Sequence, residues 1–150
     1  MENKDITFAG LFAAAYLVLG AIFMPISYML IQVRVACALI PLIAIFGYPS
    51  VVGITIGHLI FNMYFASLGP YDLLSPIVFL LPRLLIAKYG VKVMPIHTVT
   101  VAVYVGWMGS HYMAFLGGTL TWMLAVFAGE LIAEWYIGYW LLYHRVEKLL

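Results

Sequence analysis

The feature that most constrains this chain is a series of long apolar runs that charged side chains barely interrupt. The first run, from Ile6 to Met24, contains no charged residue. A helix needs about 20 apolar residues to cross the hydrocarbon core of a bilayer. The runs lack the alternation of apolar and polar residues that is typical of a membrane β-barrel, so the sequence predicts transmembrane α-helices.

Prolines, glycines and polar breaks divide the sequence into six such runs. Six spans of about 20 residues would use roughly 120 positions and would leave only short connections. We therefore predict a single domain, residues 1–150, that folds as an all-α integral membrane bundle of six transmembrane helices. The expected spans are Ile6–Met24, Val33–Phe46, Val51–Leu68, Tyr71–Lys88, Pro95–Leu116 and Thr119–Tyr143.

Composition excludes several classes of protein. Charged residues make up only 9% of the chain, whereas soluble domains carry about 25%, which excludes a soluble enzyme and a nucleic-acid-binding domain. The net charge of +1 gives no basic surplus for a polyanionic partner. The sequence contains no phosphate-binding loop and no motif typical of hydrolases. A single cysteine, Cys37, and histidines at scattered depths lead us to expect no catalysis, no cofactor and no metal.

The distribution of lysine and arginine predicts the orientation in the cell membrane. With six spans, both termini share one side with the second and fourth loops. Only Arg34 lies on the opposite side, and Arg83 lies within the fourth span. Positive residues favour the cytoplasmic side, so we expect cytoplasmic termini. The basic residues on the side of the termini are Lys4, Lys88, Lys92, Arg145 and Lys148.

The first run needs to be distinguished from a secretory signal peptide. The residues before Ile6 contain as much acid as base, whereas the head of a signal peptide is positive. The run is also longer than a signal-peptide core, and no small-residue cleavage site follows it. We therefore expect a retained transmembrane helix.

Polar and aromatic residues from several predicted spans fall at similar depths in the outward half of the bundle, counted at about 1.5 Å per residue from the helix ends. Polar groups within a bilayer are costly, so each needs a reason. Hydrogen-bonding groups and aromatic faces that converge predict a cavity, open to the outside, that binds a small planar polar molecule. The candidate substrate-binding residues are Gln32, Arg34, Asn62, Asp72, Trp107, His111, Trp122 and Glu130.

Each candidate also has a purely structural interpretation. Arg34 could extend its charge to the membrane surface, and Asp72 could cap the fourth span. His58 and Asn62, one turn apart, could join helices by hydrogen bonds. Trp122 could belong to the aromatic belt at the membrane interface.

Glu130 lies near the middle of the predicted membrane, where an acid needs a partner, water or a proton. Arg83 lies at a similar depth on the fourth span, and Glu134 is one turn beyond Glu130. The sequence leaves two interpretations open. One is a structural ion pair from Arg83 to Glu130 or Glu134, and the other is a role beneath the bound substrate.

Small residues form a second pattern on the first span. Ala9 and Ala13 repeat at a spacing of four, with Gly10 and Ala14 beside them. Such a face allows helices to approach closely in lipid. It could contact a partner protein or serve packing within the chain.

The run Ile31–Pro41 resembles the Ile-Gln-Phe-Arg-Ile-Ser-Glu-Ala-Leu-x-x-Leu-Pro stretch of the QueT family. This family comprises substrate-binding S-components of energy-coupling factor (ECF) transporters, assigned to the uptake of queuosine precursors. With the same six-span layout, the resemblance covers nearly the whole chain. It continues at Gly53, Gly57, Asn62, Leu68–Asp72, Gly129–Leu131, Gly138 and Tyr139.

The resemblance implies an ECF S-component-like fold that captures a 7-deazaguanine-type base from outside the cell. A transmembrane coupling subunit and two cytoplasmic ATPases would then drive uptake, and Ala9 and Ala13 match the face that docks on the coupling subunit. In one respect the sequence departs from the family, because Cys37 replaces a glutamate. Either Asp72 or Glu130 takes over the role of that acid, or the substrate differs and contacts Arg34.

Two alternatives therefore stand beside this hypothesis. The chain could be an S-component for a different vitamin. It could also be a non-transporting accessory subunit of a membrane protein complex, in which the polar groups only join helices. A polar cavity of solute size favours transport, and a packed core favours the accessory subunit.

Overall fold

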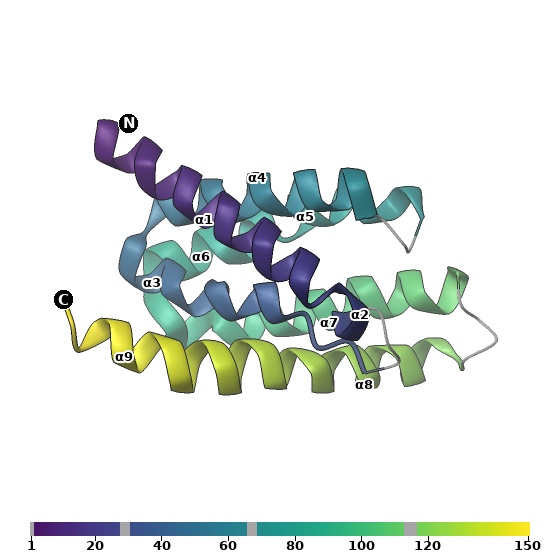
Figure 1. The fold of residues 1–150 in the computed structure, drawn as a ribbon. Helices are drawn as coiled ribbons and strands as arrows, with labels where there is room; N and C mark the ends of the chain where they lie inside the picture. Colours follow the sequence, from purple (N-terminus) through teal and green to yellow (C-terminus); the bar gives the residue numbers. More distant parts are fainter. Residues whose placement is uncertain (1, 28–30, 66–68, 113–116) are drawn as a thin grey trace.

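The computed structural model describes residues 2–27, 31–65, 69–112 and 117–150. Within these ranges every regular element is a helix, which confirms the all-α prediction. The helices pack side by side into one bundle, and both termini lie at the same end of it (Figure 1).

The first and last predicted spans form the longest rods. Helix α1 (Asn3–Ile22) is followed by the short α2 (Met24–Ser27). At the other end of the chain, α8 (Thr119–Glu130), the π-helix η5 (Leu131–Tyr143) and α9 (His144–Glu147) follow one another without a break. Within the described residues, α1 and this last rod are the two helices that are long and apolar enough to cross a membrane.

Prolines break the second and fourth predicted spans into shorter pieces, because proline lacks a backbone N–H and clashes with the preceding turn. The second span consists of a 3₁₀-helix, η1 (Val35–Leu42), and α3 (Ile43–Phe46). The fourth consists of η2 (Pro70–Leu74), α5 (Ser75–Val78) and α6 (Leu80–Tyr89).

The third and fifth predicted spans correspond to α4 (Tyr48–Phe65) and α7 (Met94–Tyr112), and η3 (Gly90–Val93) precedes α7. The predicted ends of these spans, Leu68 and Leu116, lie outside the described residues. Both helices carry buried polar side chains, so the count of six membrane crossings stays a prediction.

Helices α1 and α4 approach each other backbone to backbone, and two glycines of α4 make this possible. A Cβ atom on Gly57 would lie 2.7 Å from the carbonyl oxygen of Ala13. One on Gly53 would lie 2.8 Å from Cβ of Phe12 and still closer to the Ala9 carbonyl. The side chain of Ala9 is itself buried. This contact supports the interpretation that Ala9 and Ala13 serve packing within the chain.

Helices α7 and α8 also lie side by side (Figure 1), and here Gly109 leaves room for the ring of Trp122. The outer faces of the rods remain apolar: Leu11 on α1 is 61% exposed and Leu124 on α8 is 60% exposed. Exposed apolar faces of this kind indicate a surface that contacts lipid or another protein.

Candidate functional site

The non-helical segment 31–34 brings Gln32 and Arg34 into the interior, where both side chains are buried. The backbone of segment 31–34 packs directly against α8 at Gly129. A Cβ atom added to Gly129 would lie 2.5 Å from the carbonyl carbon of Gln32, so only glycine fits at this position. The contact places segment 31–34 beside Glu130, the next residue of α8.

His58 of α4 is the centre of a buried hydrogen-bond network. Its Nδ1 lies 3.1 Å from Nη2 of Arg83, and Nδ1 accepts this bond because arginine can only donate. The neutral ring then carries its proton on Nε2 and donates it to Oγ of Ser75, 3.2 Å away. Nη1 of Arg34 also lies 3.3 Å from Nε2, but the protonated Nε2 cannot accept a hydrogen bond from it. Two arginines from different parts of the chain thus meet at one histidine.

Asn62, one turn beyond His58, attaches the η2 turn to α4. Its Nδ2 donates to the carbonyl oxygen of Asp72 at 2.7 Å and to Oγ of Ser75 at 2.9 Å. Oγ of Ser75 in turn donates to the Asp72 carbonyl. Asn62 and Asp72 are fully buried. His58 and Asn62 therefore join helices, as their structural interpretation proposed, and they bring Asp72 into the interior.

The predicted ion pair from Arg83 to Glu130 or Glu134 is wrong. Arg83 donates to Oγ1 of Thr55 at 3.2 Å and to His58, and no ion pair joins it to either of these two described acids. Glu134 instead pairs with Nδ1 of His97. The sequence predicted similar depths for these residues, but depth does not determine which way a side chain points around the helix axis.

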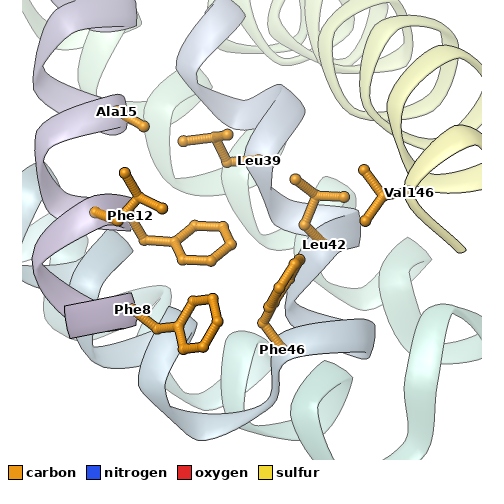
Figure 2. Close-up of a pocket in the computed structure, with 8 residues that line it drawn as sticks. Phe8, Phe12, Ala15, Leu39, Leu42, Phe46 and Val146 are labelled. Carbon is orange, nitrogen blue, oxygen red and sulfur yellow. The ribbon is translucent and has the colours of Figure 1, made fainter. Parts of the chain in front are cut away.

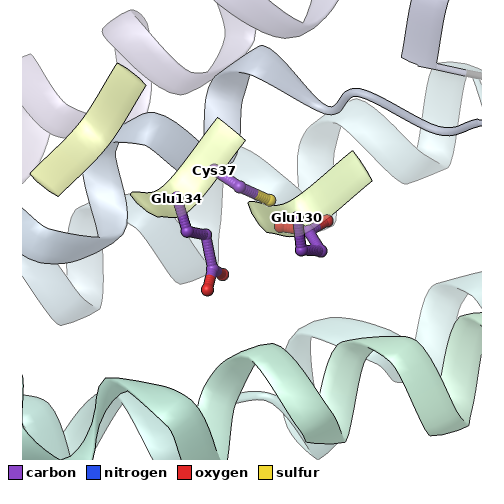
Figure 3. A group of neighbouring side chains, drawn as sticks. All are labelled: Cys37, Glu130 and Glu134. Atoms are coloured by element: carbon purple, nitrogen blue, oxygen red, sulfur yellow. The ribbon is translucent and has the colours of Figure 1, made fainter. Parts of the chain in front are cut away.

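Cys37 joins Glu130 and Glu134 in a second buried group. One side-chain atom from each of the three lies within 4.8 Å of the other two. Cys37 and Glu130 point toward each other, whereas the carboxylate of Glu134 is turned toward α7 (Figure 3). The sequence analysis did not include Cys37 among the candidate substrate-binding residues. The position of Cys37, three residues after Arg34, is the signal that could have assigned it to the site.

Several buried side-chain atoms within the described residues have no hydrogen-bond partner. Buried polar groups in proteins are nearly always hydrogen-bonded, so such atoms call for an explanation. The atoms that belong to candidate substrate-binding residues are Nε2 of Gln32, Oδ1 of Asn62, Nε1 of Trp122 and Oε2 of Glu130. Two of these atoms donate and two accept. These four residues therefore leave two donors and two acceptors of the interior without a partner.

Trp107 and His111 lie apart from this buried group, on the exposed side of α7. Their ring centroids are 4.9 Å apart, and Trp107 also contacts Tyr71, with centroids 5.5 Å apart. Trp107 and Tyr104 line a surface groove of about 460 Å³. The structure thus places these two candidates in an aromatic surface cluster.

The described residues also line a more apolar groove, of about 340 Å³, between α1, η1, α3 and α9 (Figure 2). Phe8, Phe12 and Phe46 form much of its wall. Gln32, Asn62 and Glu130 line neither this groove nor the one beside Trp107. The candidate site is therefore identified by its unpartnered polar atoms.

The sequence profile of a family described as QueT transporter matches residues 6–146. The chain belongs to the QueT transporter family. No curated protein and no solved structure matches it.

Membership of the QueT transporter family makes the chain a membrane protein whose partner is a small-molecule substrate. The two long apolar helices agree with a membrane protein. Two of the segments that carry the resemblance meet in the structure, where Gly129 contacts the backbone of Gln32.

Proposed function

We propose that this QueT-family protein is the substrate-capture S-component of an ECF-type transporter and takes up a queuosine precursor, a 7-deazaguanine-type base. The observation that carries the proposal is the set of unpartnered buried atoms on Gln32, Asn62, Trp122 and Glu130. A base of this type presents a carbonyl acceptor and several N–H donors along its edges. Its edges complement two protein donors and two protein acceptors.

Each residue then has a distinct role. Gln32 and Trp122 donate to the acceptor atoms of the base, and Asn62 and Glu130 accept from its N–H groups. Asp72, held by Asn62, fixes the η2 turn that closes the site from one side. Arg34 lies in the wall of the site beside His58. Trp107 and His111, which lie on the outside of α7, are not part of this contact set.

Uptake against a gradient needs an energy source, and this sequence contains no ATP-binding motif. We propose that an ECF coupling subunit and two cytoplasmic ATPases supply it, with both termini of a six-span chain in the cytoplasm. Gly10 and Ala14 form an exposed row of small residues on α1, and we propose that a helix of the coupling subunit packs closely against this row. A Cβ on Gly10 would meet nothing within 4 Å, whereas Ala9 and Ala13 pack against α4.

Binding isotherms on the detergent-purified protein test the substrate. We expect submicromolar affinity for a 7-deazaguanine compound and none for common vitamins. Replacing Trp122 with phenylalanine removes the Nε1 donor but keeps a ring against Gly109, and we expect about fivefold weaker binding, the value of one hydrogen bond. Trp140→Phe, an exposed tryptophan on the same rod, should bind like the native protein. The absence of any submicromolar ligand in the panel would contradict the proposal.

The network of His58, Ser75 and Asn62 favours a second candidate, a non-transporting subunit whose polar groups only join helices. A pull-down from native membranes separates the two candidates. Recovery of a coupling subunit with two ATPases supports transport, and recovery of an unrelated membrane complex supports the accessory subunit. Tight binding of another vitamin would assign the chain to that substrate, as the replacement at Cys37 allows.

A further inference from the structure

The last turns of the rod formed by α8, η5 and α9 carry positive charge that the proposed transport function does not use. We propose that a groove on this stretch binds one anionic phospholipid, with the phosphate on Arg145 and Lys148 and an acyl chain beside Trp140. The groove, termed the basic groove, encloses about 460 Å³. It belongs to the end of the bundle at which both termini lie (Figure 1). The residues that line it are Trp140, Leu141, His144, Arg145 and Lys148.

The residues of the basic groove form two rows along one side of the rod. Trp140, His144 and Lys148 recur at a spacing of four. Leu141 and Arg145 recur at the same spacing beside them, and residues four apart are neighbours on a helix surface. Each row runs from an apolar residue to a basic one in the direction of the C-terminus. The groove is therefore apolar at one end and basic at the other.

The charges of Arg145 and Lys148 are not balanced within the described residues. No ion pair there joins either side chain to an acid. The acid closest to them in the sequence, Glu147, accepts a hydrogen bond from Oη of Tyr143 at 3.1 Å and lies 3.7 Å from Nδ1 of His144. Arg145 and Lys148 are exposed, so they are accessible to an anion. A phosphate suits them, because the arginine fork matches two phosphate oxygens and lysine adds a second positive charge.

The aromatic end of the groove indicates that the anion is a lipid. Trp140 is 60% exposed and stacks on Tyr136, with ring centroids 5.5 Å apart. Exposed tryptophan and tyrosine are typical of the layer where lipid headgroups meet the hydrocarbon. Arg145 comes five residues after Trp140, about 7 Å along the rod, and the headgroup layer on one side of a bilayer is roughly 5 to 8 Å thick. A soluble phosphate ion would occupy only the basic end, whereas a phospholipid fills both ends.

Other exposed lysines of the chain already have partners within it. Nζ of Lys4 lies 3.0 Å from the carboxylate of Glu2, and Nζ of Lys88 lies 5.1 Å from the centroid of the Tyr89 ring. These lysines are therefore engaged singly, whereas the basic groove brings two cations together. Two adjacent charges attract one phosphate more strongly than a single charge does, so the basic groove is the site that selects an anionic lipid.

Native mass spectrometry of the full-length protein in detergent tests the proposal. The protein, stripped of co-purified lipid, is titrated with dioleoylphosphatidylglycerol or with dioleoylphosphatidylcholine, which share their acyl chains and differ in net charge. We expect one molecule of phosphatidylglycerol to bind about ten- to thirtyfold more tightly than phosphatidylcholine, since each basic residue near a membrane surface contributes about fivefold. Equal affinities of the native protein for the two lipids would overturn the proposal, and this comparison depends on no variant.

Substitutions locate the lipid on the basic groove. Arg145→Gln and Lys148→Gln should each weaken the binding of phosphatidylglycerol about fivefold, and the double variant about 25-fold, with little change for phosphatidylcholine. Trp140→Ala should weaken both lipids by a similar factor, because it removes the apolar wall. Lys92→Gln, at an exposed lysine of η3, is the matched control and should bind like the native protein. A double variant that keeps the native preference for phosphatidylglycerol would overturn the assignment to this groove.

Competition with inorganic phosphate separates a lipid headgroup from a soluble anion. We expect millimolar inorganic phosphate to leave the bound phosphatidylglycerol in place, because the free ion gains nothing from Trp140. Displacement of the lipid by an equal concentration of inorganic phosphate would make the groove a general anion site and would overturn the proposal. None of these measurements needs a transport substrate, so the result stands whether or not a 7-deazaguanine compound binds.

Discussion

Replacing Gly129 with alanine tests whether segment 31–34 is held in place by backbone contact with α8. The new Cβ atom would lie 2.5 Å from the carbonyl carbon of Gln32 and 3.2 Å from its nitrogen. Ordinary van der Waals contact begins at 3.4 Å, and the carbonyl oxygen of Gln32 lies closer still, so the segment must retreat by roughly 1 Å or more. Neither atom belongs to a flexible side chain, so the backbone itself has to move.

The expected cost follows from two opposing contributions. Alanine is a better helix former than glycine by about 1 kcal/mol, whereas overpacking costs about 1 to 3 kcal/mol. We expect a net loss of up to about 2 kcal/mol in the free energy of unfolding. A shift of this size also breaks a hydrogen bond from Gln32 to the ligand, since such bonds weaken steeply beyond about 3.2 Å. Affinity should therefore fall about fivefold.

Thermal unfolding in detergent and a binding isotherm measure the two effects. Gly10→Ala is the matched control, because Gly10 also lies within a long helix but a Cβ there would meet nothing within 4 Å. The control should be as stable as the native protein or slightly more so, with unchanged affinity. If Gly129→Ala behaves like Gly10→Ala in both assays, the segment is not held by this contact and the reasoning fails.

Two further substitutions test the contacts that join the helices. Arg83→Lys keeps the charge, but a single nitrogen does not replace the two that contact Thr55 and His58. The variant should therefore lower the free energy of unfolding by about 1 to 3 kcal/mol. An unchanged unfolding midpoint would contradict a stabilising role for these two hydrogen bonds. Gly53→Ala places a methyl group 2.8 Å from Cβ of Phe12 and should cost about 1 to 3 kcal/mol, measured by the same assay. A stability equal to that of the native protein would show that α1 and α4 can separate freely.

The sequence predicted the burial of several polar residues but not the direction of each side chain. Counting residues from the ends of the predicted spans brought Gln32, Asn62 and, deeper, Glu130 into one zone of the bundle, and the structure buries all three. The same counting included Trp107 and His111, which lie on the exposed side of α7. In a membrane helix the lipid-facing and core-facing sides are both apolar. Hydrophobic periodicity therefore does not reveal which way a side chain points.

Backbone irregularities were predicted only in part. Pro41 indicated a disturbance in the second span, but not that this span would be a 3₁₀-helix from Val35 to Leu42. The contact between Gly129 and Gln32 joins residues that are distant in the sequence, and no local pattern encodes it. Gly53 and Gly57 repeat at a spacing of four, so the α1–α4 contact was encoded on α4 as well as on the alanines of α1.

Segment 31–34 differs from the rods around it in its tolerance of length changes. One residue added within α8 would turn every later side chain by about 100°, which would carry Glu130 and Glu134 out of the interior together. One residue added to the non-helical segment would move only its own few side chains. Related proteins could thus acquire new ligands by altering this short stretch while the anchoring helices keep their register.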